Sequence, residues 1–220
     1  AITLLVAVFV SILLFNNIVS AADVAYIYKK SFKIDQNIVD VFESNGLTVD
    51  LIKETNIPRN FDNYRLIFVG DEKFTDASKI PVNKYPSIIA NYYHADIWGL
   101  TDNEGVSLLA QNSPLSVKKD GRLIQVYNRA IAPNGIAIKY YYLDIENVAQ
   151  SLTPIAYTEV TSSGSKFGEV IAYAEPGIIL QNGKKQDKKM CFYGIIESDY
   201  WTTGGKNLFN ECLGYVASEC

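Results

Sequence analysis

Short, almost wholly apolar runs separated by one helical repeat constrain this chain more than any other feature of its sequence. VAYIYK at 24–29 is rich in β-branched and aromatic residues, and LTVDLI at 47–52 is a second run of the same kind. Between them, apolar residues recur at helical spacing: Ile34, Ile38, Val41 and Phe42. Because the period changes from strand to helix and back, the segment predicts a parallel βαβ unit.

Three further apolar runs predict inner strands of the same sheet. They are RLIFVGDE at 65–72, PSIIANYYH at 86–94 and KMCFYGII at 189–196. Unbroken apolar runs suit parallel strands that are covered on both faces. After the last run we expect a C-terminal helix, capped by Thr202 or Thr203. One face of this helix would be apolar: Leu208, Phe209, Cys212, Leu213 and Val216.

The stretch from 123 to 180 has a different pattern. Its runs LIQVYNRA, IAIKYYYL, LTPIAYT and EVIAYAEPGIIL alternate more, and turn signals occur at 133–135, 162–165 and 181–183. Such runs favour hairpins without long helices between them. The predicted fold class is therefore α/β, a doubly wound, mainly parallel sheet with a β-hairpin-rich addition before the last strand and the C-terminal helix.

The first 22 residues carry no charged side chain and are apolar up to Asn16 and Asn17. We interpret residues 1–22 as a signal peptide, cut after Ala21 or Ala22, whose basic n-region is expected upstream. A retained membrane anchor and a pilin-type helix are the alternatives, although a spanning helix needs about 20 apolar residues. Residues 23–220 are predicted to form a single domain, exported to the cell surface or the extracellular space.

Charge and cysteine content exclude some classes of partner. The net charge of −4 argues against nucleic-acid binding, which requires a basic face. No polybasic cluster would hold the chain on an anionic membrane, so membrane contact is expected only through residues 1–22 if they are uncleaved. The three cysteines, Cys191, Cys212 and Cys220, form no CxxC pair. We expect Cys191 and Cys212 to be small buried core residues, with at most one bridge among the three.

The order of these parts resembles the class I glutamine amidotransferase-like fold, a flavodoxin-like sheet that includes the ThuA-like group. The resemblance covers most of residues 24–217 and rests on VAYIYK, LTVDLI, RLIFVGDE, PSIIANYYH and the closing CFYGIIESDYWTTGGKNLFNECLGYVA. EVIAYAEPG, a turn and KKMCFYGI, with a Tyr-Trp pair before the last helix, also resemble domains of exported archaeal surface proteins.

The residues that this family uses for catalysis are missing at the matching positions. The resemblance implies a Cys on the turn after the central strand, where this chain reads Ala90, Asn91, Tyr92 and Tyr93. It also implies a His near the end of the late strand, where Glu197 is the only titratable match. Without a thiolate and its base, nucleophilic catalysis of that type is not expected.

Other catalytic and metal motifs are absent from the sequence. His94 is the only histidine, and there is no G-x-S-x-G elbow. His94 beside Asp71, Asp96 or Asp102 has no fixed metal-ligand spacing. We therefore predict no metal and no cofactor, and no catalytic residue is assigned.

Ligands of open parallel sheets bind outside the carboxyl ends of the strands, which defines a candidate ligand rim. The rim comprises Lys29, Asp71, Glu72, Asn91, Tyr92, His94, Glu197, Asp199, Tyr200 and Trp201. Its aromatic rings could stack on a sugar while its carboxylates bind hydroxyl groups. The alternative is that the rings pack over the end of the sheet and the charges face water.

Three functions fit these observations. The first is a non-catalytic binding or structural module of a secreted or cell-surface protein, with carbohydrate or other surface proteins as its partners. The second is a carbohydrate-directed hydrolase that uses Glu197 with Asp71 or Asp199 as acid and base. The third is a filament subunit that retains its apolar N-terminal helix.

Overall fold

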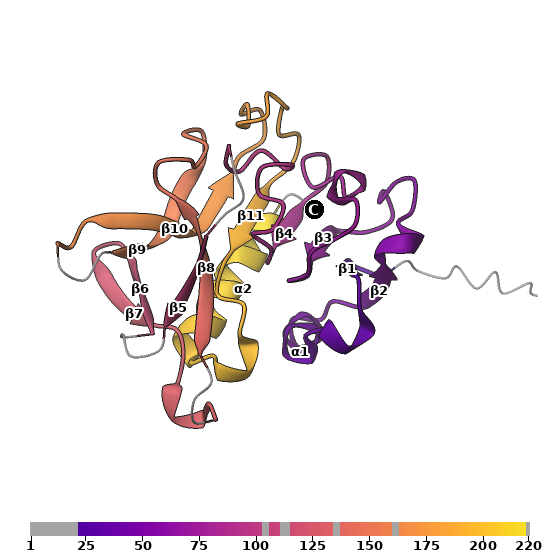
Figure 1. Cartoon of the computed structure of the whole chain (residues 1–220). Helices are drawn as coiled ribbons and strands as arrows, with labels where there is room; N and C mark the ends of the chain where they lie inside the picture. Colours follow the sequence, from indigo (N-terminus) through magenta and orange to yellow (C-terminus); the bar gives the residue numbers. More distant parts are fainter. Residues whose placement is uncertain (1–21, 103–105, 111–114, 134–136, 160–162, 219–220) are drawn as a thin grey trace, which may run out of the picture.

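The computed structural model describes residues 22–102, 106–110, 115–133, 137–159 and 163–218, and only the backbone at 106–110 (Figure 1). The predicted signal peptide lies outside the described residues except for Ala22, and so do parts of the turns expected at 133–135 and 162–165. Within these ranges, no helix is both long and apolar enough to cross a membrane.

Five of the described strands form a parallel half of the sheet, in the order β2, β1, β3, β4, β11. Their bounds are β1 (Val24–Tyr28), β2 (Val49–Lys53), β3 (Leu66–Val69), β4 (Ser87–Ile89) and β11 (Met190–Tyr193). Every residue of β3, β4 and β11 is buried. Burial on both faces explains why these strands appear in the sequence as unbroken apolar runs.

The strand expected at 86–94 is shorter than predicted. β4 pairs with β3 and β11 over three residues only, and Ile89 lies opposite Val69, the last residue of β3. Because β3 ends at Val69, β4 has no residue of β3 to pair with beyond Ile89, and the chain leaves the sheet there. It then turns, with the Trp98 amide donating to the His94 carbonyl at 3.1 Å.

The antiparallel addition comprises β5 to β10 and lies on the other side of β11 (Figure 1). β10 (Lys166–Ala174) pairs antiparallel with β11, and β9 (Thr153–Glu159) and β8 (Ile138–Asp144) both pair with β10. Beyond these strands, β5 (Val106–Ala110) pairs with β8, and β6 (Ser116–Lys119) joins β9 to β7 (Arg122–Gln125).

Two of these strands, β5 and β6, were not predicted. β6 contains two lysines and little apolar character, but it forms a hairpin with β7. The turn between them has positive φ at Asp120 (49°) and Gly121 (74°). An Asp-Gly pair is a strong hairpin signal because glycine adopts this conformation without steric cost. The sequence therefore marks this hairpin by its turn, whereas the strand β6 has no clear strand pattern.

Helices α1 (Gln36–Ser44) and α2 (Thr203–Ala217) pack against one face of β3. The Phe68 ring of β3 contacts Phe42 of α1 at 5.5 Å and Phe209 of α2 at 6.2 Å between ring centroids. Between β3 and β4 the chain forms only the short 3-10 helix η3 (Ala77–Lys79). The α/β class, with its hairpin-rich addition before the last strand and helix, is confirmed.

The corner between β11 and α2 is built as the sequence predicts. Thr202 caps the helix, because its hydroxyl accepts from the Gly205 amide at 3.2 Å. The predicted apolar face of α2 is buried. Tyr193 of β11 faces the same helix, and its hydroxyl donates to the Gly205 carbonyl at 2.8 Å. The closing stretch is therefore a packed structural corner.

Cys191 and Cys212 are buried, as expected, but they are also joined to each other. A disulfide links β11 to α2, with the two Cα atoms 6.0 Å apart and a separation of 21 residues in sequence. This bridge is within the expected limit of one, and the sequence did not indicate which cysteines it would join. Strand alternation places Cys191 on the face of β11 that meets α2, where Cys212 projects from the helix.

Candidate functional site

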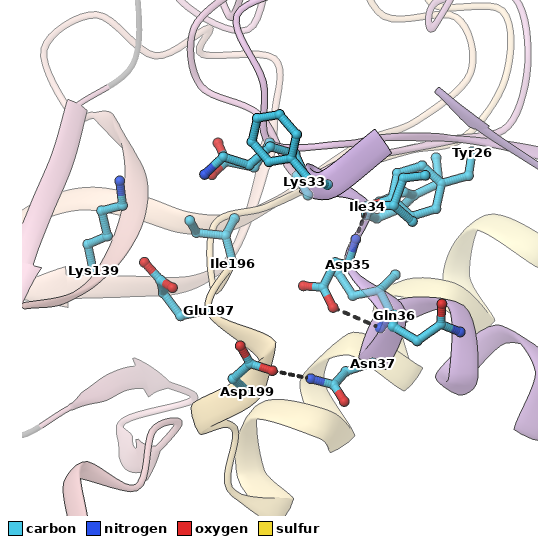
Figure 2. Close-up of a pocket in the computed structure, with 15 residues that line it drawn as sticks. Tyr26, Lys33, Ile34, Asp35, Gln36, Asn37, Lys139, Ile196, Glu197 and Asp199 are labelled. Atoms are coloured by element: carbon cyan, nitrogen blue, oxygen red, sulfur yellow. Dashed lines mark hydrogen bonds between the residues drawn. The ribbon is translucent and has the colours of Figure 1, made fainter. Parts of the chain in front are cut away.

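A cavity of about 440 Å³ opens at the carboxyl edge of the parallel half, between the start of α1 and the loop after β11 (Figure 2). This volume lies in the range of small-molecule sites, roughly 300–1,000 Å³. Figure 2 shows Lys139 and Glu197 on one side of the pocket and Asp35 on the other. The polar side chains that line it are Lys33, Asp35, Gln36, Asn37, Asp71, Lys139, Glu197 and Asp199.

Asp35 forms the N-cap of α1 and joins the two sides of the pocket. Its Oδ1 accepts from the Ile38 amide at 3.2 Å and from the Ser198 hydroxyl at 2.6 Å. Its own amide donates to the Tyr26 hydroxyl at 3.0 Å. Burial raises the pKa of Asp35, and the Ser198 hydrogen bond opposes that shift. The carboxylate is already satisfied by the protein, so its main role is to position α1 against the loop.

Asp71 follows β3 and is the most perturbed carboxyl group in the pocket. Its Oδ2 accepts from the Tyr141 hydroxyl at 3.0 Å, whereas its buried Oδ1 has no hydrogen-bond partner among the described residues. Burial raises the pKa of Asp71 to about 6, against the lowering effects of the Tyr141 hydrogen bond and of Lys139 and Lys33. An unsatisfied buried oxygen is costly, and because this one is closed to solvent it is also closed to a ligand in this conformation.

Glu197 points into the pocket without a fixed partner. No described residue hydrogen-bonds to its carboxylate or lies within ion-pair distance of it. Burial raises the pKa of Glu197, while Lys139 and Lys33 lower it. Asp199, two residues later, is held by Asn37, whose Nδ2 donates to it at 2.6 Å.

Two lysines complete the pocket. Neither Lys33 nor Lys139 forms an ion pair within 4.0 Å in the described part of the chain. Lys139 Nζ lies 5.8 Å from the centroid of the Tyr141 ring. The site therefore contains two ammonium groups and the carboxyl group of Glu197 with hydrogen-bonding capacity left for a ligand, whereas the unsatisfied Oδ1 of Asp71 is closed to solvent.

Three residues of the predicted rim, Asp71, Glu197 and Asp199, line this pocket, and the other seven do not. Glu72 accepts from the backbone amides of Lys29 and Lys30 at 2.6 and 2.9 Å, which ties β1 to the end of β3. The Lys29 ammonium donates to the Lys73 carbonyl at 2.8 Å. Asn91 is fully buried, and its Nδ2 donates to the carbonyls of Gly70 and Glu72. These polar groups hold the edge of the sheet together.

The predicted aromatic rim is packed rather than exposed. Tyr92 lies 4.1 Å from the Tyr141 ring, and Trp201 donates from Nε1 to the Ile195 carbonyl at 2.9 Å. Tyr200 packs against the core, and its carbonyl accepts from the Asn128 amide at 2.7 Å. His94 is buried, and its Nε2 accepts from the Phe74 amide at 2.9 Å, so that nitrogen is not available to a ligand. The rings therefore agree with the packing alternative, but its second part, that the charges face water, does not hold for Glu72, which is buried.

The pocket contains residues that the sequence argument missed. The stretch between β1 and α1 contains three of them, Phe32, Lys33 and Asp35. The rule that ligands bind at the carboxyl ends of parallel strands would have included these residues if we had applied it as far as the N-cap of α1. Lys139 lies in β8 of the antiparallel addition and reaches the site only through tertiary packing. No local pattern marks it.

The chemistry of the donor set is limited to carboxyl, ammonium, amide and aromatic groups. No residue that lines the pocket is a cysteine or a histidine. Among the described residues, no group of three or more His, Cys, Asp or Glu side chains could hold a metal ion. The pocket can donate and accept hydrogen bonds and transfer protons.

Comparisons with known proteins return structures but no sequence family. No protein-family model matches the chain, and no curated protein matches it in sequence. A protein named as a GMP synthase subunit from Thermoplasma acidophilum is 12% identical, over 90% of this chain and 96% of that one, with a TM-score of 0.48. A glutamine amidotransferase from Thermotoga maritima is 9% identical over 89% and 84% of the two chains, with a TM-score of 0.41.

A third similar structure, PurLQS from Thermotoga maritima, is 11% identical over 88% of this chain and 98% of that one, with a TM-score of 0.42. Similarities of this size carry no activity or ligand over to the present chain. The fold class rests on the chain's own strand order, and the function has to be argued from the pocket.

Proposed function

We propose that this chain is an amidotransferase-like domain that serves as a non-catalytic binding module of an exported, cell-surface or secreted protein, with its ligand in the pocket at the carboxyl edge. The observation that carries the proposal is the set of unpartnered charged groups there. The side chains of Glu197, Lys33 and Lys139 form no hydrogen bond or ion pair among the described residues, and Asp71 Oδ1 accepts no hydrogen bond. Polar groups held without partners in a concave site favour an external ligand.

Loss of the resembled family's nucleophile supports binding over catalysis. The turn after β4 carries Asn91, which bonds two carbonyls, in place of a reactive thiol. The two described cysteines are joined in a disulfide, so neither can supply a thiolate. Thiolate attack on an amide or ester is therefore not supported at this site.

The Cys191–Cys212 disulfide also supports the export proposal. Disulfides persist mainly in oxidising compartments and are rare in the cytosol of mesophiles. The uncharged, apolar start of the sequence agrees with this interpretation. Mass spectrometry of the natively expressed protein tests it, because an exported chain should begin at Ala22 or Asp23 and carry one intact disulfide. A chain that retains residues 1–21, or that is fully reduced, would contradict export with cleavage.

A matched pair of variants tests the binding proposal. Ligand-observed NMR against a set of small polar metabolites should show binding to the native chain and weaker binding to Glu197→Gln. Glu175→Gln, a change in the turn after β10 and outside the pocket lining, serves as the control. Turnover of glutamine or of an aryl ester that disappears in Glu197→Gln would overturn the non-catalytic assignment.

A carbohydrate-directed hydrolase is the second candidate, and one observation favours it. Burial raises the pKa values of both Asp71 and Glu197 in the same pocket, and a carboxyl group with a raised pKa can serve as the general acid of such an enzyme. Release of nitrophenol from aryl glycosides, abolished by Asp71→Asn and by Glu197→Gln, would establish this function in place of simple binding.

A further inference from the structure

One exposed aromatic ring lies at the mouth of the pocket. Phe32 is 78% exposed, the largest exposed fraction among the large hydrophobic residues described, and it lines the cavity. It belongs to η1 (Ser31–Lys33), immediately before the pocket residue Lys33. The Lys30 ammonium lies 5.8 Å from its ring centroid, and no aromatic residue packs against it among the described residues. Lys30 therefore lies over one face of the ring, and the other face is open to an apolar contact beside the polar groups.

The pocket holds more carboxyl groups than ammonium groups, because Asp35, Asp71, Glu197 and Asp199 share it with Lys33 and Lys139. The hydrogen bonds from Ser198 to Asp35 and from Asn37 to Asp199 satisfy their oxygens but leave their charges in place. The excess of carboxyl groups disfavours an anionic ligand, and the two lysines disfavour a ligand with a large positive charge. A neutral ligand whose groups both donate and accept would satisfy both kinds of group. Hydroxyl groups have that property.

We propose that the ligand of this pocket is a neutral carbohydrate, with the apolar face of one sugar ring against Phe32. Its hydroxyls would donate to Glu197 and would accept from Lys139 and Lys33. This inference rests on the proposed binding function and gives it a ligand class. It moves the stacking platform from the predicted rings of Tyr92 and Trp201, which are packed, to a ring outside the predicted rim.

The same charges would also accept a zwitterion such as an amino acid, so the two ligand classes must be separated experimentally. A zwitterion with an ordinary ammonium group, such as glutamine, binds through its two charged groups and has no need of a flat apolar surface. A quaternary ammonium zwitterion such as glycine betaine can also bind an aromatic face, so it is tested directly beside the sugars. A sugar ring gains from an aromatic face because its C–H groups are apolar on one side. Dependence of binding on Phe32 therefore distinguishes a sugar from an ordinary amino acid.

Saturation-transfer NMR on residues 22–220, with the disulfide intact, provides the test. The sugar probes are glucose, galactose, mannose, N-acetylglucosamine, maltose and cellobiose, and the comparison probes are glutamine, glycine betaine and inorganic phosphate. We expect saturation of at least one sugar and of no comparison probe. Phe32→Ala should weaken sugar binding about tenfold, the size expected for loss of one ring contact, whereas Phe32→Trp should retain it.

Phe167→Ala is the matched control, because Phe167 is a partly exposed phenylalanine of the antiparallel addition and does not line the pocket. It should leave sugar binding unchanged. Thermal unfolding of each variant confirms that the fold is intact. Phe32 makes no described core contact, so its removal should not change the unfolding temperature.

The possible outcomes separate the two proposals. Binding of glutamine or betaine without any sugar would overturn the carbohydrate inference and leave the binding function standing. Sugar binding that is insensitive to Phe32→Ala would overturn the stacking geometry and with it this inference. No binding of any probe by the folded chain would count against both. Sugar that binds and is cleaved would support the ligand class and replace the binding function with hydrolysis.

Discussion

The parallel half and the antiparallel addition bury their strands in different ways. The strands β3 and β4 of the parallel half are four and three residues long and completely buried. In the addition, β9 and β10 are seven and nine residues long, and β9 alternates between buried and more exposed positions along its second half. Short strands that are covered on both faces depend for their stability on the elements packed on each side. A longer antiparallel ladder can leave one face in water.

This difference determines where a ligand can bind. The parallel half brings the ends of β1, β3 and β11 to one edge, with Asp71 and Glu197 following two of these strands. The addition contributes Lys139 of β8 to the pocket lining, and Tyr141 of the same strand donates to Asp71. The pocket is thus a property of the junction between the two regions, and the predictions below test that junction from the strongest expected effect to the weakest.

Removal of a buried ring from the parallel half should lower the free energy of unfolding more than removal of a partly exposed ring from the addition. Phe209 is fully buried and contacts the rings of Phe42, Phe68 and Tyr193. Phe209→Ala should lower the free energy of unfolding by about 3–5 kcal/mol, because it leaves a cavity. Phe167→Ala, with its ring 38% exposed, should cost less than about half as much. Urea unfolding measures both, and equal losses would contradict the contrast drawn between the two regions.

The disulfide should stabilise the parallel half by restricting the unfolded chain. Closure of a loop with 21 residues of sequence separation corresponds to about 3 kcal/mol in the chain-entropy account. The variant with both Cys191→Ala and Cys212→Ala should lose an amount of that order in urea unfolding. Dithiothreitol should destabilise the native chain and leave this double variant unchanged. A native chain whose unfolding midpoint does not respond to the reductant would show that the bridge is absent in solution.

The sequence predicts the parallel half well because each of its strands is a local signal. β1, β3 and β11 are continuous apolar runs, and Thr202 caps α2 where the first turn needs an acceptor. The pocket is harder to predict because its members come from distant segments. Lys139 has no local mark, and the packing of Tyr92 depends on contact with Tyr141 of β8, a strand that lies far from it in sequence.

A single methyl group should disturb the junction itself. Gly194 follows β11, and a Cβ at this position would lie 2.0 Å from the Tyr141 carbonyl oxygen of β8. The Gly194 backbone and the Tyr141 carbonyl lie in a packed region, so neither can shift without a cost in free energy. Gly194→Ala should cost about 2–3 kcal/mol, as for an overpacked core. Gly214→Ala, where nothing lies within 4 Å of the added carbon, is the control and should be neutral or stabilising in its helix. If Gly194→Ala and Gly214→Ala changed the free energy of unfolding equally, the parallel half and the addition would be loosely packed against each other.

Asp71 should make the junction sensitive to pH. Its pKa is about 6 in the folded chain, against 3.8 for an ordinary Asp, so the folded state binds more protons between these values. This contribution to the free energy of unfolding is fully present below pH 3.8 and is lost as the pH rises through about 6. Asp71→Asn removes it, so the variant should gain about 1–2 kcal/mol relative to the native chain at pH 7.5 and little at pH 4. A difference between the two proteins that does not change with pH would contradict the raised pKa.

Glu197 provides the smallest expected effect and the sharpest separation of structure from function. Its carboxylate has no hydrogen-bond or ion-pair partner among the described residues, although its own amide donates to the Tyr127 hydroxyl at 3.3 Å. Glu197→Gln keeps the shape of the side chain and removes only the charge, so the free energy of unfolding should change by less than about 1 kcal/mol. The same variant should weaken ligand binding, because the charged acceptor is lost from the pocket. Urea unfolding and ligand titration on one preparation give both numbers. If Glu197→Gln destabilises the chain as much as Phe209→Ala does, the carboxylate is a structural group and the pocket loses its best candidate for ligand contact.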